Sequence, residues 1–236
     1  MSSSKDSLDS AQIEDFSSIP LAKHGSTAAK NHKRSLGMVP SESRAATAAA
    51  VGVSPKRSIR PGKERWSVKT GTDADRDLVN LKQRVAATVE ELVRMPRPHD
   101  MAPPNHSFSG YDNRRAEGVE TTVWTVEAEI YAYKEEDDGD YHLAIQGDKA
   151  LTMIAEAPNP KSNFVSPKSP FAKAIAAVRK EIDQKLKPAP TREYQKIRQR
   201  AEITGVGFFD RVHGQLGHAP SGIELHPILH IKFLKK

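Results

Sequence analysis

The chain has 236 residues, a formal net charge of +6 and no cysteine. The lack of cysteine excludes disulfides, thiolate zinc sites and a cysteine nucleophile, and it agrees with a reducing compartment. No run of about twenty apolar residues predicts a transmembrane helix, and the first residues lack the apolar core of a signal peptide. We therefore expect an intracellular, cytoplasmic protein with no membrane partner.

Residues 1–62 are rich in Ser, Ala, Lys and Pro and show little periodic hydrophobicity, which predicts a disordered basic tail. Residues 1–65 contain 11 Lys and Arg against 6 Asp and Glu, whereas the rest of the chain contains 25 against 24. The basic excess therefore lies at the start of the chain, and the remainder is nearly neutral. Two uses of this tail stay open: a solvated arm, or an arm that helps to bind nucleic acid.

Residues 63–118 are expected to form a lead-in of helix and loop. Thr88 and Glu91 have the spacing of a capping box, so a shorter helix that begins at Thr88 competes with one long helix. The prolines that follow end either helix. The apolar residues at helical spacing are Leu78, Leu81, Val85, Val89 and Leu92.

The first predicted strand of the region 119–236 covers residues 121–133, where side chains alternate between two faces. Trp124, Val126, Ala128, Ile130 and Ala132 make the apolar face. Tyr131 and Tyr133 fall on the opposite, solvent-facing side. Exposed strand tyrosines either pack across strands or stack on bases, so this pair fits a structural role or a nucleic-acid platform.

Four more strands are predicted at 141–146, 151–157, 200–209 and 222–233, and a helix at 169–186 begins near Ser169 as N-cap. The last strand has one apolar face, made of Ile223, Leu225, Leu229, Ile231 and Phe233.

This chain order predicts a mainly β (α+β) domain at 119–236. Three strands, a helix and two strands are the order of an OB-fold, a small five-stranded barrel with its helix between the third and fourth strands. A generic α+β sandwich stays open, because chain order does not fix strand pairing.

Eight polar residues collect at the ends of these strands and in the glycine-rich loop before the last one. By strand parity, Glu224 and His226 point away from the apolar face of their strand. Asp140 and His142 share a side of the second strand in the same way. The full set is Asp140, His142, Glu156, Asp210, His213, Gln215, Glu224 and His226.

Three interpretations of this set stay open: a hydrogen-bonded lock at the barrel end, contact with a ligand, and a metal or acid–base site. Carboxylates and imidazoles suit a divalent metal or proton transfer. No known catalytic spacing is present, so we assign no catalytic residue. The candidate metal ligands are Asp140, His142, Asp210, His213, Glu224 and His226.

Four sequence elements are shared with a known family: "VKT" at 68–70, "DGDYHL" at 138–143, "MIAE" at 153–156 and "GVGFFDxxHGQxGxAPxGIELHP" at 205–227. From about Arg65 onward the chain resembles a widespread family of uncharacterised bacterial proteins. It departs from that family at His218 and Ser221, where relatives usually have an apolar residue and Asn. The resemblance implies no activity.

Two functions follow as expectations. The first is an OB-like binding module that engages nucleic acid with help from the basic tail. The alternative is a metal-dependent phosphodiesterase or nuclease-like hydrolase that uses the Asp/His/Glu set.

Overall fold

Seven strands and a few helices make up the part of the chain that this computed structural model describes, residues 16–23, 61–101, 103–104, 108 and 110–235. The strands are β1 (Leu21–Lys23), β2 (Arg84–Ala86), β3 (Val123–Glu135), β4 (Tyr141–Gln146), β5 (Thr152–Ala157), β6 (Gln195–Phe209) and β7 (Ile223–Phe233). The helices are α1 (Trp66–Thr70), α2 (Val89–Val93) and α3 (Ala172–Lys185), with 3-10 turns η1 (Phe16–Ser18) and η2 (Arg76–Leu78). The prediction of a mainly β chain is confirmed.

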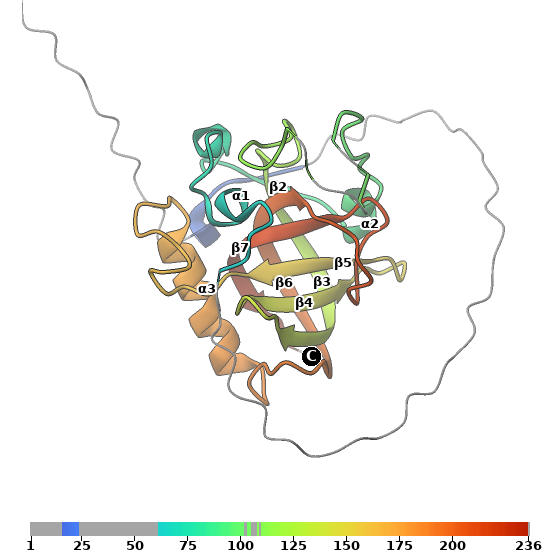
Figure 1. The fold of residues 1–236 in the computed structure, drawn as a ribbon. Helices are drawn as coiled ribbons and strands as arrows, with labels where there is room; N and C mark the ends of the chain where they lie inside the picture. The colour runs from blue at the N-terminus through green and yellow to red at the C-terminus, as the bar shows by residue number, and fades with distance from the viewer. Residues whose placement is uncertain (1–15, 24–60, 102, 105–107, 109, 236) are drawn as a thin grey trace, which may run out of the picture. The chain divides into compact units, whose positions relative to one another are not determined.

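Strands β3 to β7 form the centre of one mixed sheet, in the order β3-β4-β5-β7-β6 (Figure 1). β3 is antiparallel to β4 and also to β6, so the first and the last of these five strands are hydrogen-bonded to each other. β5 and β7 are parallel. The main apolar core draws on all five strands and on α2 and α3.

A β-bulge in β3 changes which residues are buried. The register of β3 with both neighbours shifts between Ile130 and Ala132, and such a bulge moves the following side chains to the other face. Tyr133 is 1% exposed and belongs to the main core, and its hydroxyl donates to Pro188 O at 2.6 Å. The prediction that Tyr133 faces solvent is therefore wrong, while Tyr131 stays partly exposed.

β7 shows two further register shifts in its pairing with β6, one between Leu225 and Ile228 and one around Leu229. Ile228 therefore joins the main core together with Ile223, whereas Leu229 packs in a second core cluster. The predicted single apolar face that contained both Ile223 and Leu229 is wrong for this reason.

The lead-in contains a short strand and a short helix instead of one long helix. Glu91 N donates to Thr88 Oγ1 at 3.1 Å, and Thr88 N donates to the Glu91 carboxylate at 2.8 Å. This capping box starts α2, which confirms the shorter helix. The long helix is wrong, because Arg84–Ala86 is extended and pairs with β3.

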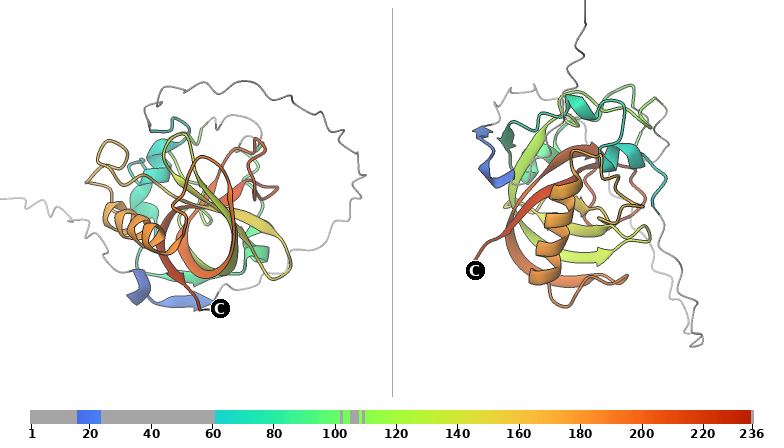
Figure 2. Two further views of the ribbon diagram at one scale, coloured as in Figure 1. Left: turned by 90° about the horizontal axis from the view of Figure 1, so that it is seen from below. Right: turned by 90° about the vertical axis from the view of Figure 1, so that its left-hand side faces the viewer.

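The segment Phe16–Lys23 belongs to the same compact unit as residues 61–235. Phe16 and Ile19 are 1% and 8% exposed and pack in the second core cluster. β1 pairs parallel to β2, at the edge of the sheet (Figure 2). The prediction that all of 1–62 is a disordered tail is therefore wrong for this segment, which completes an apolar core. The rest of that predicted tail, up to residue 60, lies outside the described residues.

α3 connects β5 to β6 and packs against β7. Ile175 lies in the second core cluster, and Val178 and Ile182 lie in the main core. Phe171, and not the predicted Ser169, is the N-cap residue, although Ser169 Oγ accepts a hydrogen bond from Phe171 N at 3.1 Å. Neither α3 nor any other helix in the described part of the chain has the length and apolarity to cross a membrane.

Candidate functional site

Strand pairing brings two histidines to one glutamate. His142 and Glu156 are register partners in the antiparallel pair of β4 and β5, and His142 Nδ1 lies 3.0 Å from Glu156 Oε1. In the parallel pair of β5 and β7, Ile154 lies opposite Glu224, which brings His226 level with Glu156. His226 Nδ1 lies 3.1 Å from Glu156 Oε2. The carboxylate of Glu156 therefore contacts both imidazoles.

Two more carboxylates surround His226. Asp140 Oδ2 is 3.4 Å from Nε2, and Glu224 Oε1 is 3.5 Å from Nδ1. Asp140 and His226 have 0% exposure, and Glu224 has 2%. We call Asp140, Glu156, Glu224 and His226 the inner cluster. Asp140, Glu156 and His226 each offer a ligand atom, and these atoms lie within 4.8 Å of one another.

Several atoms of the inner cluster make no hydrogen bond to the described part of the chain. They are Asp140 Oδ2, Glu224 Oε1 and both ring nitrogens of His226. The ring nitrogens have oxygens nearby, but not in the direction that a hydrogen bond requires. Buried polar groups are nearly always paired, and an unpaired one costs about 1–3 kcal/mol. These four atoms have charged neighbours at 3.1–3.5 Å but no hydrogen bond, and this incomplete hydrogen bonding favours a ligand site over a hydrogen-bonded lock.

Lys69, on α1, brings positive charge to the inner cluster, and the sequence did not single it out as a site residue. Its Nζ lies 3.4 Å from Asp210 Oδ2, and its side chain is 9% exposed. Burial lowers the pKa of Lys69, but the charges of Asp210, Glu156, Glu224 and Asp140 outweigh burial and raise it above the usual range. Lys69 therefore stays charged and offsets part of the negative charge around it.

The cluster residues differ in their preferred protonation states. Burial raises the pKa of Glu156, but the two histidines outweigh burial and hold it well below its usual value. Burial and the neighbouring carboxylates raise the pKa of Glu224 to about 8. Burial and Lys69 lower the pKa of His226, yet its three carboxylate neighbours hold it well above the usual value. In the absence of a bound cation, the cluster therefore keeps extra protons at neutral pH.

The loop between β6 and β7 carries three of the predicted site residues but brings only Asp210 towards the inner cluster. Asp210 N donates to Gly222 O at 2.8 Å, and Gly222 has φ +74°, where a Cβ would overlap the Asp210 carbonyl. His213 is exposed, and its backbone N–H donates to Gln215 Oε1 at 2.8 Å. His213 therefore lies in the lining of a pocket that it shares with His142, Glu156 and Asp210, outside the group of buried carboxylates around His226.

A pocket of about 360 Å³ opens beside the inner cluster. Its lining consists of Gly62, Lys63, Glu64, Lys69, Glu136, Asp137, Asp138, His142, Glu156, Asp210, His213 and Gln215. Glu156 is the member of the inner cluster that reaches this pocket. Glu136 and Asp138 belong to the lining as well, although they were not among the predicted site residues. Burial and the charges of Asp140 and Glu156 raise the pKa of Asp138 to about 6.

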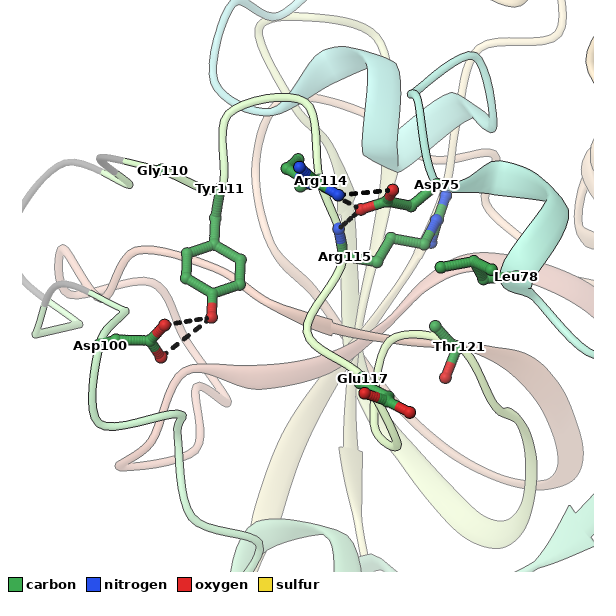
Figure 3. Close-up of a pocket in the computed structure, with 9 residues that line it drawn as sticks. All are labelled: Asp75, Leu78, Asp100, Gly110, Tyr111, Arg114, Arg115, Glu117 and Thr121. Carbon is green, nitrogen blue, oxygen red and sulfur yellow. Dashed lines mark hydrogen bonds and ion pairs between the residues drawn. The ribbon is translucent and has the colours of Figure 1, made fainter.

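A larger pocket of about 540 Å³ has paired polar groups (Figure 3). The Tyr111 hydroxyl donates to the Asp100 carboxylate at 2.9 Å, and Arg114 Nε donates to Asp75 Oδ2 at 3.3 Å. None of the unpaired buried atoms found in the described residues belongs to its lining. The smaller pocket, which adjoins the unpaired atoms, is therefore the better candidate.

No family model matches the chain, and neither the curated proteins nor the solved structures include a match. The family resemblance of the "DGDYHL" and "GVGFFD" elements thus stays a prediction.

Proposed function

We propose that this protein binds a divalent cation through Asp140, Glu156 and His226 and uses it to hydrolyse a phosphodiester. The observation that carries this proposal is His226, which is 0% exposed and has no hydrogen bond at either ring nitrogen within the described residues. One imidazole and two carboxylates form a donor set that suits Mn²⁺, Zn²⁺ or Fe²⁺.

The balance of charge also supports a cation. The carboxylates of Asp140, Glu156, Glu224 and Asp210 all act on Lys69. A buried excess of negative charge is costly unless it is paired. A divalent cation offsets that excess directly, whereas the metal-free cluster has to bind protons instead.

The pocket explains why a phosphodiester is the substrate we favour. Its acidic lining repels a phosphate group unless a cation lies between them. A cation polarises the phosphate oxygens and lowers the pKa of a bound water. A cation held by Asp140, Glu156 and His226 would let the water oxygen attack phosphorus, with cleavage of the P–O ester bond and transfer of a proton from the water to the leaving oxygen. Lys69, which lines this pocket, is positioned to stabilise the negative charge that develops.

The scaffold that we infer is an OB-like barrel. Five strands in which β3 pairs with both β4 and β6, with α3 between the third and fourth of them, support this assignment. Such a fold does not by itself assign an activity. The activity is argued from the side chains of β4, β5 and β7.

A metal-free module that binds nucleic acid has less support. Tyr133, one of the two predicted stacking residues, is buried. The basic excess of the sequence falls within residues 1–65, most of which lie outside the described residues. Nucleic acid therefore enters the proposal as a phosphodiester substrate.

Thermal unfolding with and without Mn²⁺ or Zn²⁺ tests the metal site. A cation present at 100 times its Kd stabilises the folded chain by about 2.7 kcal/mol. We expect this gain in the wild type, its loss in His226→Ala, and its retention in His99→Ala, whose side chain is 100% exposed. A wild type that does not respond to metal, together with a His226→Ala variant that is still destabilised, would establish the hydrogen-bonded lock instead.

Hydrolysis of bis(4-nitrophenyl) phosphate tests the activity separately. The metal-loaded wild type and His99→Ala should release nitrophenolate, and His226→Ala should not. A protein that binds metal but leaves this diester intact keeps its metal site and loses the phosphodiesterase assignment.

A further inference from the structure

The carboxylate of Glu156 turns one oxygen to each of two histidines. Oε2 faces His226 at 3.1 Å in the inner cluster, and Oε1 faces His142 at 3.0 Å on the pocket side. The two contacts use different oxygens, so a single carboxylate joins the inner cluster to the pocket. A carboxylate in this position can bridge two cations.

The ring of His142 is oriented like that of a metal ligand. Its Nε2 lies 2.9 Å from Leu216 O, and because a carbonyl only accepts, Nε2 carries the proton. In the neutral ring, Nδ1 is then an acceptor, and it faces Glu156 Oε1 at 3.0 Å and Glu136 Oε1 at 3.4 Å. Metal-bound histidines commonly donate their other N–H to a backbone carbonyl in this way.

The three groups on the pocket side reach the pocket lining, unlike most of the inner cluster, although His142 is 1% exposed and Glu156 is 8% exposed. Glu136, His142 and Glu156 offer ligand atoms within 4.8 Å of one another, and all three line the 360 Å³ pocket. The side chain of Glu136 is 28% exposed. Asp140 and His226 do not line this pocket. Closed metal sites are typically structural, whereas catalytic sites keep a position open for water or substrate.

We propose that Glu136, His142 and Glu156 hold a second divalent cation on the pocket side of the first, with Glu156 bridging the two. This inference rests on the proposed function, and it deepens it by assigning substrate contact to the outer cation. Two cations about 3.5–4 Å apart clamp the attacking and leaving oxygens of a phosphoryl group.

The inner half of this centre contains side-chain atoms that make no hydrogen bond to the described residues and belong to residues more than nine-tenths buried. Both ring nitrogens of His226 and Oε1 of Glu224 are in this state. An anionic phosphodiester that enters the pocket meets the outer cation first, with Lys69 in the same lining. A neutral ester gains much less from two cations, so the substrate class is an anionic phosphodiester.

Manganese stoichiometry and electron paramagnetic resonance test the two-metal centre on the full chain. Protein stripped by a chelator is saturated with Mn²⁺, freed of excess metal by gel filtration, and analysed for manganese. We expect two Mn²⁺ per chain and an exchange-coupled spectrum, since a bridging carboxylate couples the two ions. Glu136→Gln should retain one Mn²⁺ with an uncoupled six-line spectrum. His142→Ala should behave in the same way, and Glu136→Gln carries the test if the buried histidine variant fails to fold.

Asp137→Asn is the matched control, because Asp137 lines the same pocket and its side chain is 82% exposed. It should retain two coupled ions. One Mn²⁺ in the wild type overturns the second site and leaves the proposed function intact, whereas no bound Mn²⁺ overturns both. Two uncoupled ions overturn the bridge, and a Glu136→Gln variant that keeps a coupled pair overturns the ligand assignment.

Discussion

Two buried groups of charged residues contact Phe208, and they differ in whether their polar atoms are hydrogen-bonded. The Phe208 ring centroid is 4.7 Å from Arg65 Cζ and 5.5 Å from the His226 ring centroid. Arg65 donates to the two carboxylate oxygens of Glu120 at 2.6 and 2.7 Å and to three backbone carbonyls. Glu120 also accepts from two backbone N–H groups. The inner cluster, in contrast, leaves four buried atoms unpaired.

This contrast separates a structural ion pair from a site. Both Arg65 and Glu120 have side chains that are 0% exposed, so burial of charge is common to the two regions. Glu120 accepts from Phe209 N at 2.8 Å, and the pair thereby fixes the end of β6. Only the inner cluster leaves polar atoms for which a ligand would supply the partner. Incomplete hydrogen bonding, and not burial, is therefore the feature that points to function.

The largest expected effect is the loss of the complete ion pair. Glu120→Gln leaves Arg65 buried without its counter-charge, and breaking a buried pair in this way costs about 3–5 kcal/mol. Urea denaturation measures the loss. Glu117→Gln, an exposed position in the same loop, should change stability by less than about 0.5 kcal/mol.

The metal response of Glu120→Gln sharpens the comparison. The stabilisation by Mn²⁺ should persist in this variant, because Glu120 is not a ligand. If Glu120→Gln keeps its stability but loses the response to metal, the ion pair belongs to the site and the contrast is wrong.

A smaller effect is expected at Asp140, and it should depend on metal. Asp140 Oδ1 accepts a hydrogen bond from Asn159 N at 3.1 Å. The side-chain oxygen of an asparagine at position 140 can accept the same hydrogen bond. Asp140 Oδ2 makes no hydrogen bond to the described residues. Asp140→Asn should therefore change the metal-free stability by less than about 1 kcal/mol and remove the gain of about 2.7 kcal/mol at saturating metal. Urea denaturation with and without Mn²⁺ gives both values. A large metal-free loss would mean that Asp140 is part of a lock.

The sequence predicted much of the inner cluster because strand parity is a local property. The period of two places His142, Glu224 and His226 opposite to the apolar side chains of their strands. The structure brings the two histidines to Glu156 and Glu224 to His226. The same rule failed for Tyr133, because the bulge in β3 depends on pairing with two neighbouring strands.

Residues whose role depends on distant packing were missed. Lys69 lies 141 positions from Asp210, which it contacts, and nothing in its five-residue helix indicates that contact. Phe16 was missed for a similar reason, since the members of its core cluster other than Ile19 lie far away in the chain.

The last expected effect is a dependence of metal-free stability on pH. Glu224 has a pKa of about 8 in the folded chain and an ordinary value of 4.5. Between these values the folded chain holds a proton that the unfolded chain releases, so the free energy of unfolding falls as pH rises. The raised pKa of His226 acts in the same direction, because its contribution is lost as pH rises through the folded value.

Glu224→Gln should flatten this slope and remove about 3 kcal/mol of the fall in the free energy of unfolding between pH 5 and pH 8, since each unit of pKa difference corresponds to about 1.4 kcal/mol. Saturating Mn²⁺ should flatten it as well, because the cation replaces the protons that balance the cluster. Urea denaturation at several pH values, with and without metal, measures both changes.

Glu120→Gln is the control: it should lower the free energy of unfolding at every pH and leave the slope unchanged, since the ion pair of Glu120 does not depend on the protonation of the inner cluster. A metal-free wild type whose stability rises with pH across this window would mean that Glu224 is ionised in the folded chain. An ionised Glu224 would need a hydrogen-bond partner for Oε1. The contrast in hydrogen bonding between the Arg65–Glu120 pair and the inner cluster would then be wrong.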